Sequence, residues 1–343
     1  TAGLADHDQA NLRVIAPGAA KDGYSYSVIV TGTCPEFDIS DTVQLIIKYD
    51  PAVATDPFDL AVCEGQPAGF GIDAGSTATP LFQWQLSTDN GSSFADLLDS
   101  AFYSGTKTDS LFISTTQSRF DGYQYQVVIT GDCGSSITSN PATLTINEVP
   151  EIVGQPVDTA VCENEPAWFE VDAGVTSLAT YQWQDEMNDT NGYQDIGEDT
   201  LGVYQGFQSA RLDLLNPESR FNGYRYRVIV SGECIPPVTS QPATITVFEK
   251  AEITTQPDFS VICEEQSTVF TVNAGATTAA TFTWQVDMDD DGNFDTIGAD
   301  TAVYSGHANP SLIMTTIPAS YNGYIYRVII GGVCPETVTS DTA

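Results

Sequence analysis

The sequence predicts an all-β protein, an extended array of tandem β-sandwich domains, and two observations carry that prediction. Cysteine and tryptophan landmarks recur with a period of about 100 residues along the 343-residue chain, as expected for an array of whole domains. The chain also contains 28 Gly and 18 Pro, a composition that fits short strands joined by turns better than long helices. We therefore expect almost no helix.

Three repeats share the same landmarks. Each repeat has an opening cysteine, a tryptophan 21 residues later and a closing cysteine; in chain order these are Cys63, Trp84 and Cys133; Cys162, Trp183 and Cys234; and Cys263, Trp284 and Cys334. An F-x-[IV]-x-A-G segment that begins at Phe70, Phe169 or Phe270 alternates like a half-buried strand. A Gly/Asn/Asp-rich turn follows each tryptophan segment and predicts a hairpin.

The two ends of the chain repeat only part of this pattern. Residues 22–28 match the segment before a closing cysteine and lead to Cys34, but no tryptophan precedes them. Residues 340–343 match 139–142, and the strand corresponding to 143–146 is missing. We therefore predict half a domain at 1–50, domains at 51–149 and 150–249, and a domain lacking its last strand at 250–343. Prolines near the joints favour short, extended linkers.

A [DN]-G-Y-x-Y-x-V phrase precedes each closing cysteine, and with the tryptophan on the third strand it carries a family resemblance. The repeats resemble the immunoglobulin-like domains of giant Bacteroidota surface adhesins, including gliding-motility adhesins, over essentially the whole chain. The phrase resembles a tyrosine corner, with Tyr26, Tyr125, Tyr226 and Tyr326 as the corner residues. The resemblance implies a structural or adhesive repeat region of a secreted cell-surface protein.

The cysteines depart from the antibody pattern, in which a disulfide crosses the core beside the tryptophan. That place is held by valine, at Val28, Val127, Val228 and Val328, so apolar packing replaces the core bond. The cysteines have moved outward, and we expect one bridge within each repeat: Cys63 with Cys133, Cys162 with Cys234, and Cys263 with Cys334. Cys34 is expected to have no partner in this chain. Metal ligation is disfavoured because no C-x-x-C occurs.

The charge excludes several functions. The chain has 46 acidic and 11 basic residues, a formal net charge of -35, which repels phosphate backbones and anionic lipid. We therefore expect no nucleic-acid partner and no membrane insertion. Persistent disulfides imply an oxidising, extracellular location at the cell surface.

We expect no catalytic residues. The only two histidines, His7 and His307, lie in no arrangement that suggests a nucleophile and its base, and no G-x-S-x-G, H-E-x-x-H or Walker motif occurs. Features that recur in every repeat are determinants of fold rather than of catalysis. The chain is therefore predicted not to be an enzyme.

The third repeat contains a candidate calcium loop. Its D-x-D-x-D-G-x-x-D spacing places oxygen ligands at alternate positions, as in the first half of calcium loops, with Asp287, Asp289, Asp291 and Asp295 as the expected ligands. The alternative interpretation is a polar hairpin turn, because residues 87–94 form an Asp-box-like segment that needs no metal, and the second repeat has Glu186, Asn188 and Thr190 at the first three positions.

A second local pattern is Asp followed by Ser or Thr and then an apolar residue or Thr, which resembles the O-glycosylation sequon of Bacteroidota. It occurs at Thr42, Ser100, Ser110, Thr159, Thr200, Thr296, Thr301 and Thr342. The alternative is that these are ordinary turn pairs in an Asp- and Thr-rich β-protein. Both interpretations stay open.

The function predicted from these features is a disulfide-stabilised rod or filament that extends a binding tip or mediates surface adhesion. Its partners are expected to be cell-surface or extracellular ligands, including glycans or other copies of the chain. The alternative is a set of spacer or glycan-binding modules in a large secreted enzyme. Trp168, whose counterparts are Gly69 and Val269, is expected to face outward. Strand exchange between chains ranks last.

Overall fold

The all-β class is confirmed by the computed structural model, which describes residues 4–187, 192–197 and 202–343. The described residues form short strands and four 3₁₀ helices of three residues each, η1 (Ala19–Lys21), η2 (Ser118–Phe120), η3 (Ser219–Phe221) and η4 (Ala319–Tyr321). Among them, no helix has the length and apolar character needed to cross a membrane. The chain divides into two compact units, Thr1–Glu148 and Val149–Ala343.

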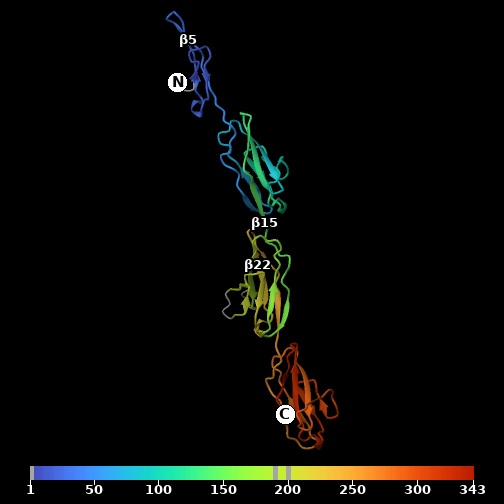
Figure 1. Ribbon diagram of the computed structural model, residues 1–343. Coiled ribbons are helices and arrows are strands. Elements are labelled where there is room, and N and C mark those ends of the chain that lie inside the picture. The colour runs from blue at the N-terminus through green and yellow to red at the C-terminus, as the bar shows by residue number, and fades with distance from the viewer. Residues whose placement is uncertain (1–3, 188–191, 198–201) are drawn as a thin grey trace. The chain divides into compact units, whose positions relative to one another are not determined.

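Residues 51–149, here called module 1, form two facing sheets (Figure 1). The larger sheet contains, in spatial order, β10 (Ala95–Asp96), β9 (Leu81–Ser87), β13 (Gln124–Thr130), β15 (Ala142–Asn147) and β7 (Leu60–Cys63), with β14 (Ser136–Thr138) beside β13. The smaller sheet contains β11 (Tyr103–Ser104), β12 (Ser110–Ile113) and β8 (Ala68–Gly71). All pairings are antiparallel except that of β15 with β7.

Residues 150–249, module 2, repeat this topology. The larger sheet contains β16 (Thr159–Cys162), β24 (Ala243–Phe248), β22 (Arg225–Ser231), β18 (Thr180–Glu186) and β19 (Gln194–Asp195), with β23 (Val238–Thr239) beside β22. The smaller sheet contains β17 (Ala167–Glu170), β21 (Arg211–Leu214) and β20 (Tyr204–Gln205). The parallel pair recurs between β16 and β24.

Residues 250–343, module 3, have a shorter large sheet. It contains β27 (Asp295–Thr296), β26 (Thr281–Asp287), β30 (Ile325–Gly331) and β31 (Val338–Thr339), and it faces β25 (Thr268–Thr271), β29 (Ser311–Met314) and β28 (Tyr304–Ser305). Residues 260–263, which correspond to β16, form no strand. This edge lacks the partner strand that β24 supplies in module 2.

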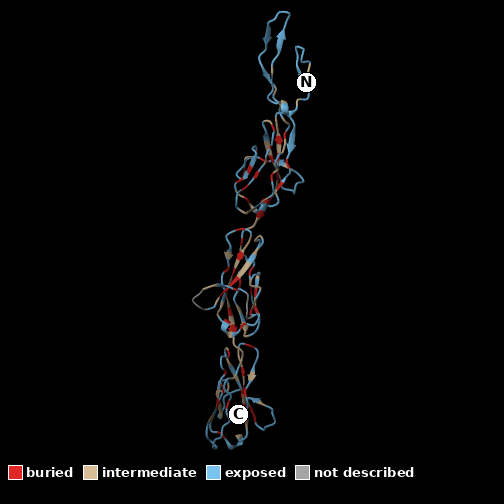
Figure 2. Ribbon diagram, turned by 90° about the vertical axis from the view of Figure 1, so that its left-hand side faces the viewer, coloured by how far each residue is buried: buried red, intermediate tan, exposed pale blue. Residues whose placement is uncertain are grey.

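Each module has its own core centred on its tryptophan. Trp84, Trp183 and Trp284 are fully buried in three separate apolar clusters, and Figure 2 marks buried positions along the chain within all three modules. The Trp183 indole N–H donates a 2.9 Å hydrogen bond to the Ser209 carbonyl, so the ring is buried with its polar group satisfied. These clusters fall within the predicted repeats, while the domain limits themselves stay a prediction.

Valine packing replaces the antibody disulfide, as the sequence indicated. Val127, Val228 and Val328 are fully buried in the three cores. At the position of the tyrosine corner, the Tyr125 hydroxyl lies 3.2 Å from the Tyr103 hydroxyl, and the same pair recurs in modules 2 and 3. Burial raises the pKa of these phenols, to about 12 for Tyr304. Two tyrosine hydroxyls thus satisfy one another inside each core.

Residues 1–50, for which half a domain is predicted, include no buried residue among those described. Its strands are β1 (Leu4–Ala5), β2 (Arg13–Val14), β3 (Ser25–Tyr26), β4 (Ile29–Thr31), β5 (Phe37–Ile39) and β6 (Val43–Gln44). Residues 22–28 pair with the following strand as their counterparts do in the full modules, since Tyr26 pairs with Val43 as Tyr125 pairs with Ala142. Without a facing sheet, Val28 is exposed. The local pairing therefore persists where a sandwich core does not form.

The two tryptophans of module 2 offer a matched test of this core. We expect Trp183→Ala to lower the free energy of unfolding of module 2 by about 3 to 5 kcal/mol, because it removes a fully buried ring. We expect Trp168→Ala to cost less than about 1 kcal/mol, since that ring is 52% exposed and loses chiefly a cation–π contact. Hydrogen exchange read on module 2 peptides measures both variants. Equal losses of protection would contradict a tryptophan-centred core.

Candidate functional site

A disulfide joins two consecutive modules. Cys162, the last residue of β16 in module 2, is bonded to Cys334, which lies between β30 and β31 of module 3. Their Cα atoms are 5.8 Å apart, and 172 positions separate them in the sequence. The bond is therefore a staple between modules and not a clamp within one.

Strand direction explains why the opening cysteine is carried to the junction. β16 runs parallel to β24, and β24 is followed directly by the link to module 3, so Cys162 lies at the end of module 2 that faces that link. β22 is antiparallel to β24 and ends at the opposite end of the module. The closing cysteine that follows β22 is thus separated from Cys162 by the length of the sandwich.

The predicted pairing within repeats is wrong for all three bridges. Cys162 bonds Cys334 and not Cys234, and Cys133 and Cys263, the expected partners of Cys63 and Cys334, are free thiols. Cys63 and Cys234 are both disulfide-bonded. Cys34, expected to have no partner, is free and exposed. Even spacing indicated that each repeat has two cysteines but not which end of the sandwich each one reaches.

Polar noncovalent contacts also lie near the staple. The Lys250 ammonium lies 3.7 Å from a Glu165 carboxylate oxygen and 3.3 Å from one of Glu336. The Glu249 amide donates a 2.8 Å hydrogen bond to the Thr278 hydroxyl. Solvent-exposed ion pairs of this kind contribute at most about 1 kcal/mol each, so the disulfide is the strongest link across the junction.

Sequence reasoning missed these junction residues. Their signal is the spacing from the opening cysteine of one repeat to the closing cysteine of the next, 172 positions for Cys162 and Cys334, which recurs at 171 for Cys63 and Cys234. Lys250 is one of 11 basic residues in the chain, and its place in the link between two modules was a second available signal. Neither signal identifies which residues are in contact unless the strand directions are also known.

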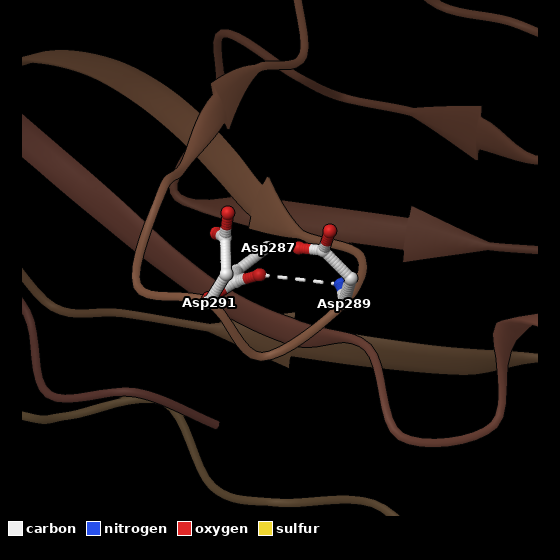
Figure 3. A group of neighbouring side chains, drawn as sticks. All are labelled: Asp287, Asp289 and Asp291. Carbon is white, nitrogen blue, oxygen red and sulfur yellow. Dashed lines mark hydrogen bonds between the residues drawn. The ribbon is translucent and has the colours of Figure 1, made fainter.

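The predicted calcium loop brings three of its four aspartates together. Asp287, Asp289 and Asp291 place ligand oxygens within 4.8 Å of one another, and Figure 3 shows their carboxylates around one turn. Asp287 ends β26 and is buried, and its carboxylate accepts the amides of Asp289 at 3.3 Å and of Gly292 at 2.9 Å. The arrangement offers clustered hard oxygen atoms, the ligand type that Ca²⁺ prefers.

Asp295, the fourth expected ligand, lies outside this group. It begins β27 and pairs with Val286 across the hairpin, so strand pairing removes it from the turn. In module 2, Glu186 at the place of Asp287 forms an ion pair with Arg225, while Asn188 and Thr190 lie outside the described residues. The three-aspartate group is therefore specific to module 3 among the loops that the structure describes.

The loops of modules 1 and 3 differ in how they hold negative charge. In module 1 the Ser93 hydroxyl and amide and the Ser87 hydroxyl donate to the Asp89 carboxylate, and these bonds lower its pKa to about 2. In module 3 the nearby Asp291 carboxylate, followed by partial desolvation, raises the pKa of Asp289. Module 1 thus has a satisfied polar turn, whereas module 3 has carboxylates that repel one another.

The predicted glycosylation positions are mostly accessible. Six are exposed, namely Thr42, Ser100, Ser110, Thr296, Thr301 and Thr342, while Thr159 is half-buried and Thr200 lies outside the described residues. The Ser100 hydroxyl accepts the Tyr103 amide at 3.2 Å, and the Thr301 hydroxyl accepts the Tyr304 amide at 3.0 Å. At these two equivalent positions the Asp-Ser and Asp-Thr pairs form turns.

Trp168 faces outward from β17, as expected. The Arg211 guanidinium lies 4.8 Å from the centroid of its ring, and Arg211 also forms an ion pair with Asp213 at 2.6 Å. One ring face is therefore covered by a neighbouring cation, which is a cation–π contact. Trp168 is a partly covered surface residue.

The Asp89 turn gives a prediction for pH dependence. Its pKa of about 2 in the folded chain is below the ordinary value of 3.8, so its stabilising effect is complete above pH 3.8 and is lost as the pH falls toward 2. Carboxyl titration by NMR should place Asp89 near 2, and Asp89→Asn should flatten the loss of β9 and β10 exchange protection between pH 4 and pH 2. An Asp89 titration at 3.8 or above would contradict the turn geometry.

Comparison with known proteins identifies the fold. No family model and no curated protein matches the sequence. The I-band fragment I67–I69 of titin is similar at 14% identity over 86% of this chain and 97% of that one, with a TM-score of 0.59. An E-to-A variant of the same titin domains is similar at 14% identity over 85% of this chain and 96% of that one, with a TM-score of 0.58. At this identity the similarity shows the fold alone, and the chain is an array of tandem immunoglobulin-like domains.

Proposed function

We propose that this chain is a structural and adhesive repeat segment of a large secreted cell-surface protein, in which consecutive modules are stapled so that the array extends a binding tip or mediates adhesion. The observation that carries the proposal is the Cys162–Cys334 bond. Persistent disulfides are typical of proteins outside the cytosol. The resemblance to Bacteroidota adhesins, including gliding-motility adhesins, agrees with this function.

The staple changes the path that a pulling force takes. A force applied to the ends of the unit Val149–Ala343 follows the shortest covalent route, along residues 149–162, across the disulfide, and along residues 334–343. The chain between the two cysteines lies outside that route. Because Trp183 and Trp284 and most residues of both cores lie in the bypassed segment, the force acts on few of the residues that form the cores.

The covalent route is also short. Roughly 24 residues at ~3.5 Å per residue extend to about 80 Å, whereas the roughly 195 residues of the unstapled chain reach about 680 Å. A stapled pair of modules therefore has little length to release, even if both cores unfold. This property suits a protein that transmits tension between a surface and a ligand.

The staple also stabilises both modules against unfolding. Closing a loop of this length contributes about 5 kcal/mol in the chain-entropy model. That is a large share of the 5 to 15 kcal/mol typical of a folded domain. Unlike a bridge within one sandwich, it restricts the unfolded chains of two modules together.

The charge defines which partners are compatible with adhesion. At a net charge of -35, extracellular proteins with basic surfaces, neutral glycans and cation-bridged copies of the chain are compatible partners, whereas nucleic acids are repelled. We propose that Ca²⁺ binds the turn at Asp287, Asp289 and Asp291 and offsets their repulsion. O-glycosylation at the exposed hydroxyls belongs to the same proposal.

Force spectroscopy tests the proposed function. With the full chain held at Val149 and Ala343, we expect the oxidised protein to extend to about 80 Å, and the double variant Cys162→Ser, Cys334→Ser to gain roughly 600 Å of contour length, because the bypassed residues join the force path. Non-reducing peptide mapping of the same sample identifies the bond.

Cys263→Ser is the matched control, since Cys263 is a free thiol, and it should behave like the parent. A parent that releases the full contour length while the bond is intact would contradict the proposed force path. A peptide map that links Cys162 to Cys234 would contradict the bond between the modules.

Calcium binding has its own test. We expect Ca²⁺ to increase the exchange protection of β26 and β27, and a chelator to reverse the effect, because the cation relieves repulsion among three carboxylates. The double variant Asp289→Asn, Asp291→Asn should lose the response. The control is Asp89→Asn in the equivalent turn of module 1, which should keep it. Unchanged protection in the parent would remove the site.

A further inference from the structure

The outer face of the small sheet in module 2 carries an aromatic ring beside charged and polar side chains. Trp168 of β17 lies opposite Asp213 of β21, and Gln205 of β20 lies opposite Asp213 on the other side. Two residues further along, Glu170 lies opposite Arg211. The residues between these in β17 and β21 are buried. The charged and aromatic side chains of these two strands therefore lie together on the solvent side of the sheet.

The sandwich fold does not require this group. The pair that corresponds to Trp168 and Asp213 is Gly69 with Phe112 in module 1, and Val269 with Ile313 in module 3. Neither pair contains a charged residue. Because modules 1 and 3 form the same small sheet without the group, its residues in module 2 are free to serve binding.

The Trp168 ring is held on one side and open on the other. The Arg211 guanidinium covers one ring face at 4.8 Å from its centroid, and the residue is still 52% exposed. Arg211 is itself fixed, since its Nε lies 2.8 Å and one Nη lies 2.6 Å from Oδ1 of Asp213. A ring whose orientation is set before a ligand arrives loses little conformational entropy on binding.

The indole N–H of Trp168 has no acceptor among the residues that the structure describes. The core tryptophans differ, because Trp84 donates to the Thr108 carbonyl and Trp284 to the Asn309 carbonyl, both at 3.0 Å. Trp168 therefore offers a ligand an apolar ring face and a hydrogen-bond donor on its edge.

Acceptors and further donors lie beside the ring. Both contacts between Arg211 and Asp213 use the same carboxylate oxygen, so the other oxygen of Asp213 can accept from a ligand. The exposed Glu170 and Gln205 add a second carboxylate and an amide. A hexose has C–H groups on its faces and hydroxyls around its rim, and an aromatic ring flanked by such polar groups matches both.

The charge of the group favours a neutral sugar. Glu170 and Asp213 contribute two negative charges and Arg211 one positive charge, within a chain of net charge -35. A uronate, sulfate or phosphate group would meet a repulsive field, and the guanidinium is already paired. An apolar protein surface would bury the two carboxylates without new hydrogen bonds, which is costly.

We infer that this face of module 2 is a binding platform for neutral glycans. A hexose ring stacks on the open face of Trp168, while its hydroxyls accept from the indole N–H and donate to the free oxygen of Asp213. One stacked ring with a few hydrogen bonds corresponds to a dissociation constant of about 1 mM. The inference rests on the adhesive part of the proposed function and names the class of partner.

The Trp168 indole N–H is a direct reporter of binding in the full chain. With ¹⁵N-labelled tryptophan, NMR resolves the four indole signals, one for each tryptophan. The neutral probes are cellohexaose, maltohexaose and mannohexaose, and the anionic probe is hexagalacturonate. We expect at least one neutral hexaose to shift the Trp168 signal saturably, and the three buried indole signals to stay in place. Hexagalacturonate should shift none of the four.

Three variants separate the platform from the fold. Trp168→Ala should abolish the response of the β17 and β21 amides to the hexaose while module 2 keeps its exchange protection. Asp213→Asn should raise the dissociation constant roughly tenfold, because a charged acceptor is lost. Phe112→Ala is the matched control, since that ring is 49% exposed on the equivalent face of module 1, and it should bind like the parent.

Several outcomes would overturn the inference. They are no shift with any of the three neutral hexaoses, a response that persists in Trp168→Ala, or a response that is lost in Phe112→Ala. A shift with hexagalacturonate as large as with the neutral probes would identify an anion site instead. A Trp168 signal that moves with protein concentration alone would indicate docking of a second copy.

Peptide mapping of the same samples keeps the two proposals distinct. A Cys162–Cys334 bond together with a silent Trp168 signal contradicts the glycan platform and leaves the stapled array standing. A missing bond together with a saturable shift contradicts the staple and supports the platform.

Discussion

The parallel pairing of the first and last strands of modules 1 and 2 is the constraint on which the rest of the structure depends. β16 can carry Cys162 to the link with module 3 only because it runs in the same direction as β24. The antiparallel strand β22 brings the other cysteine of the module to the opposite end. Two cysteines at opposite ends of one sandwich cannot bond each other, and Cys162 bonds Cys334 of module 3 instead.

Much of the fold could be predicted from the sequence because its determinants are local and recur three times. The alternation that begins at Phe169 and the tryptophan at position 183 place residues of known type in a buried strand pair, and both are buried. Val228 in the place of the antibody cysteine is buried for the same reason. Periodicity and residue type are sufficient to predict a contact that lies within one sheet or between two facing sheets.

The site was less predictable because it depends on where the ends of strands lie. Residue spacing treats Cys162 and Cys234 as a pair, since no sequence pattern records that β16 pairs with β24 in parallel. Asp295 was predicted as a ligand but lies outside the group for a related reason. The alternate spacing of aspartates fits a calcium loop, but the hairpin register places that residue in β27. The sequence also did not indicate the partner of the Tyr125 hydroxyl, which is the Tyr103 hydroxyl, 22 positions away.

A covalent link suits this junction because noncovalent links there are weak. With 46 acidic and 11 basic residues, modules of the same sign repel one another, and Lys250 supplies the positive charge of the ion pairs with Glu165 and Glu336. Those pairs weaken as salt screens them, whereas a disulfide does not depend on ionic strength. The acidic surface can therefore keep the array soluble while the sulfur bond keeps neighbouring modules together, so the two features that distinguish this sequence, its charge and its regularly spaced cysteines, have complementary physical roles.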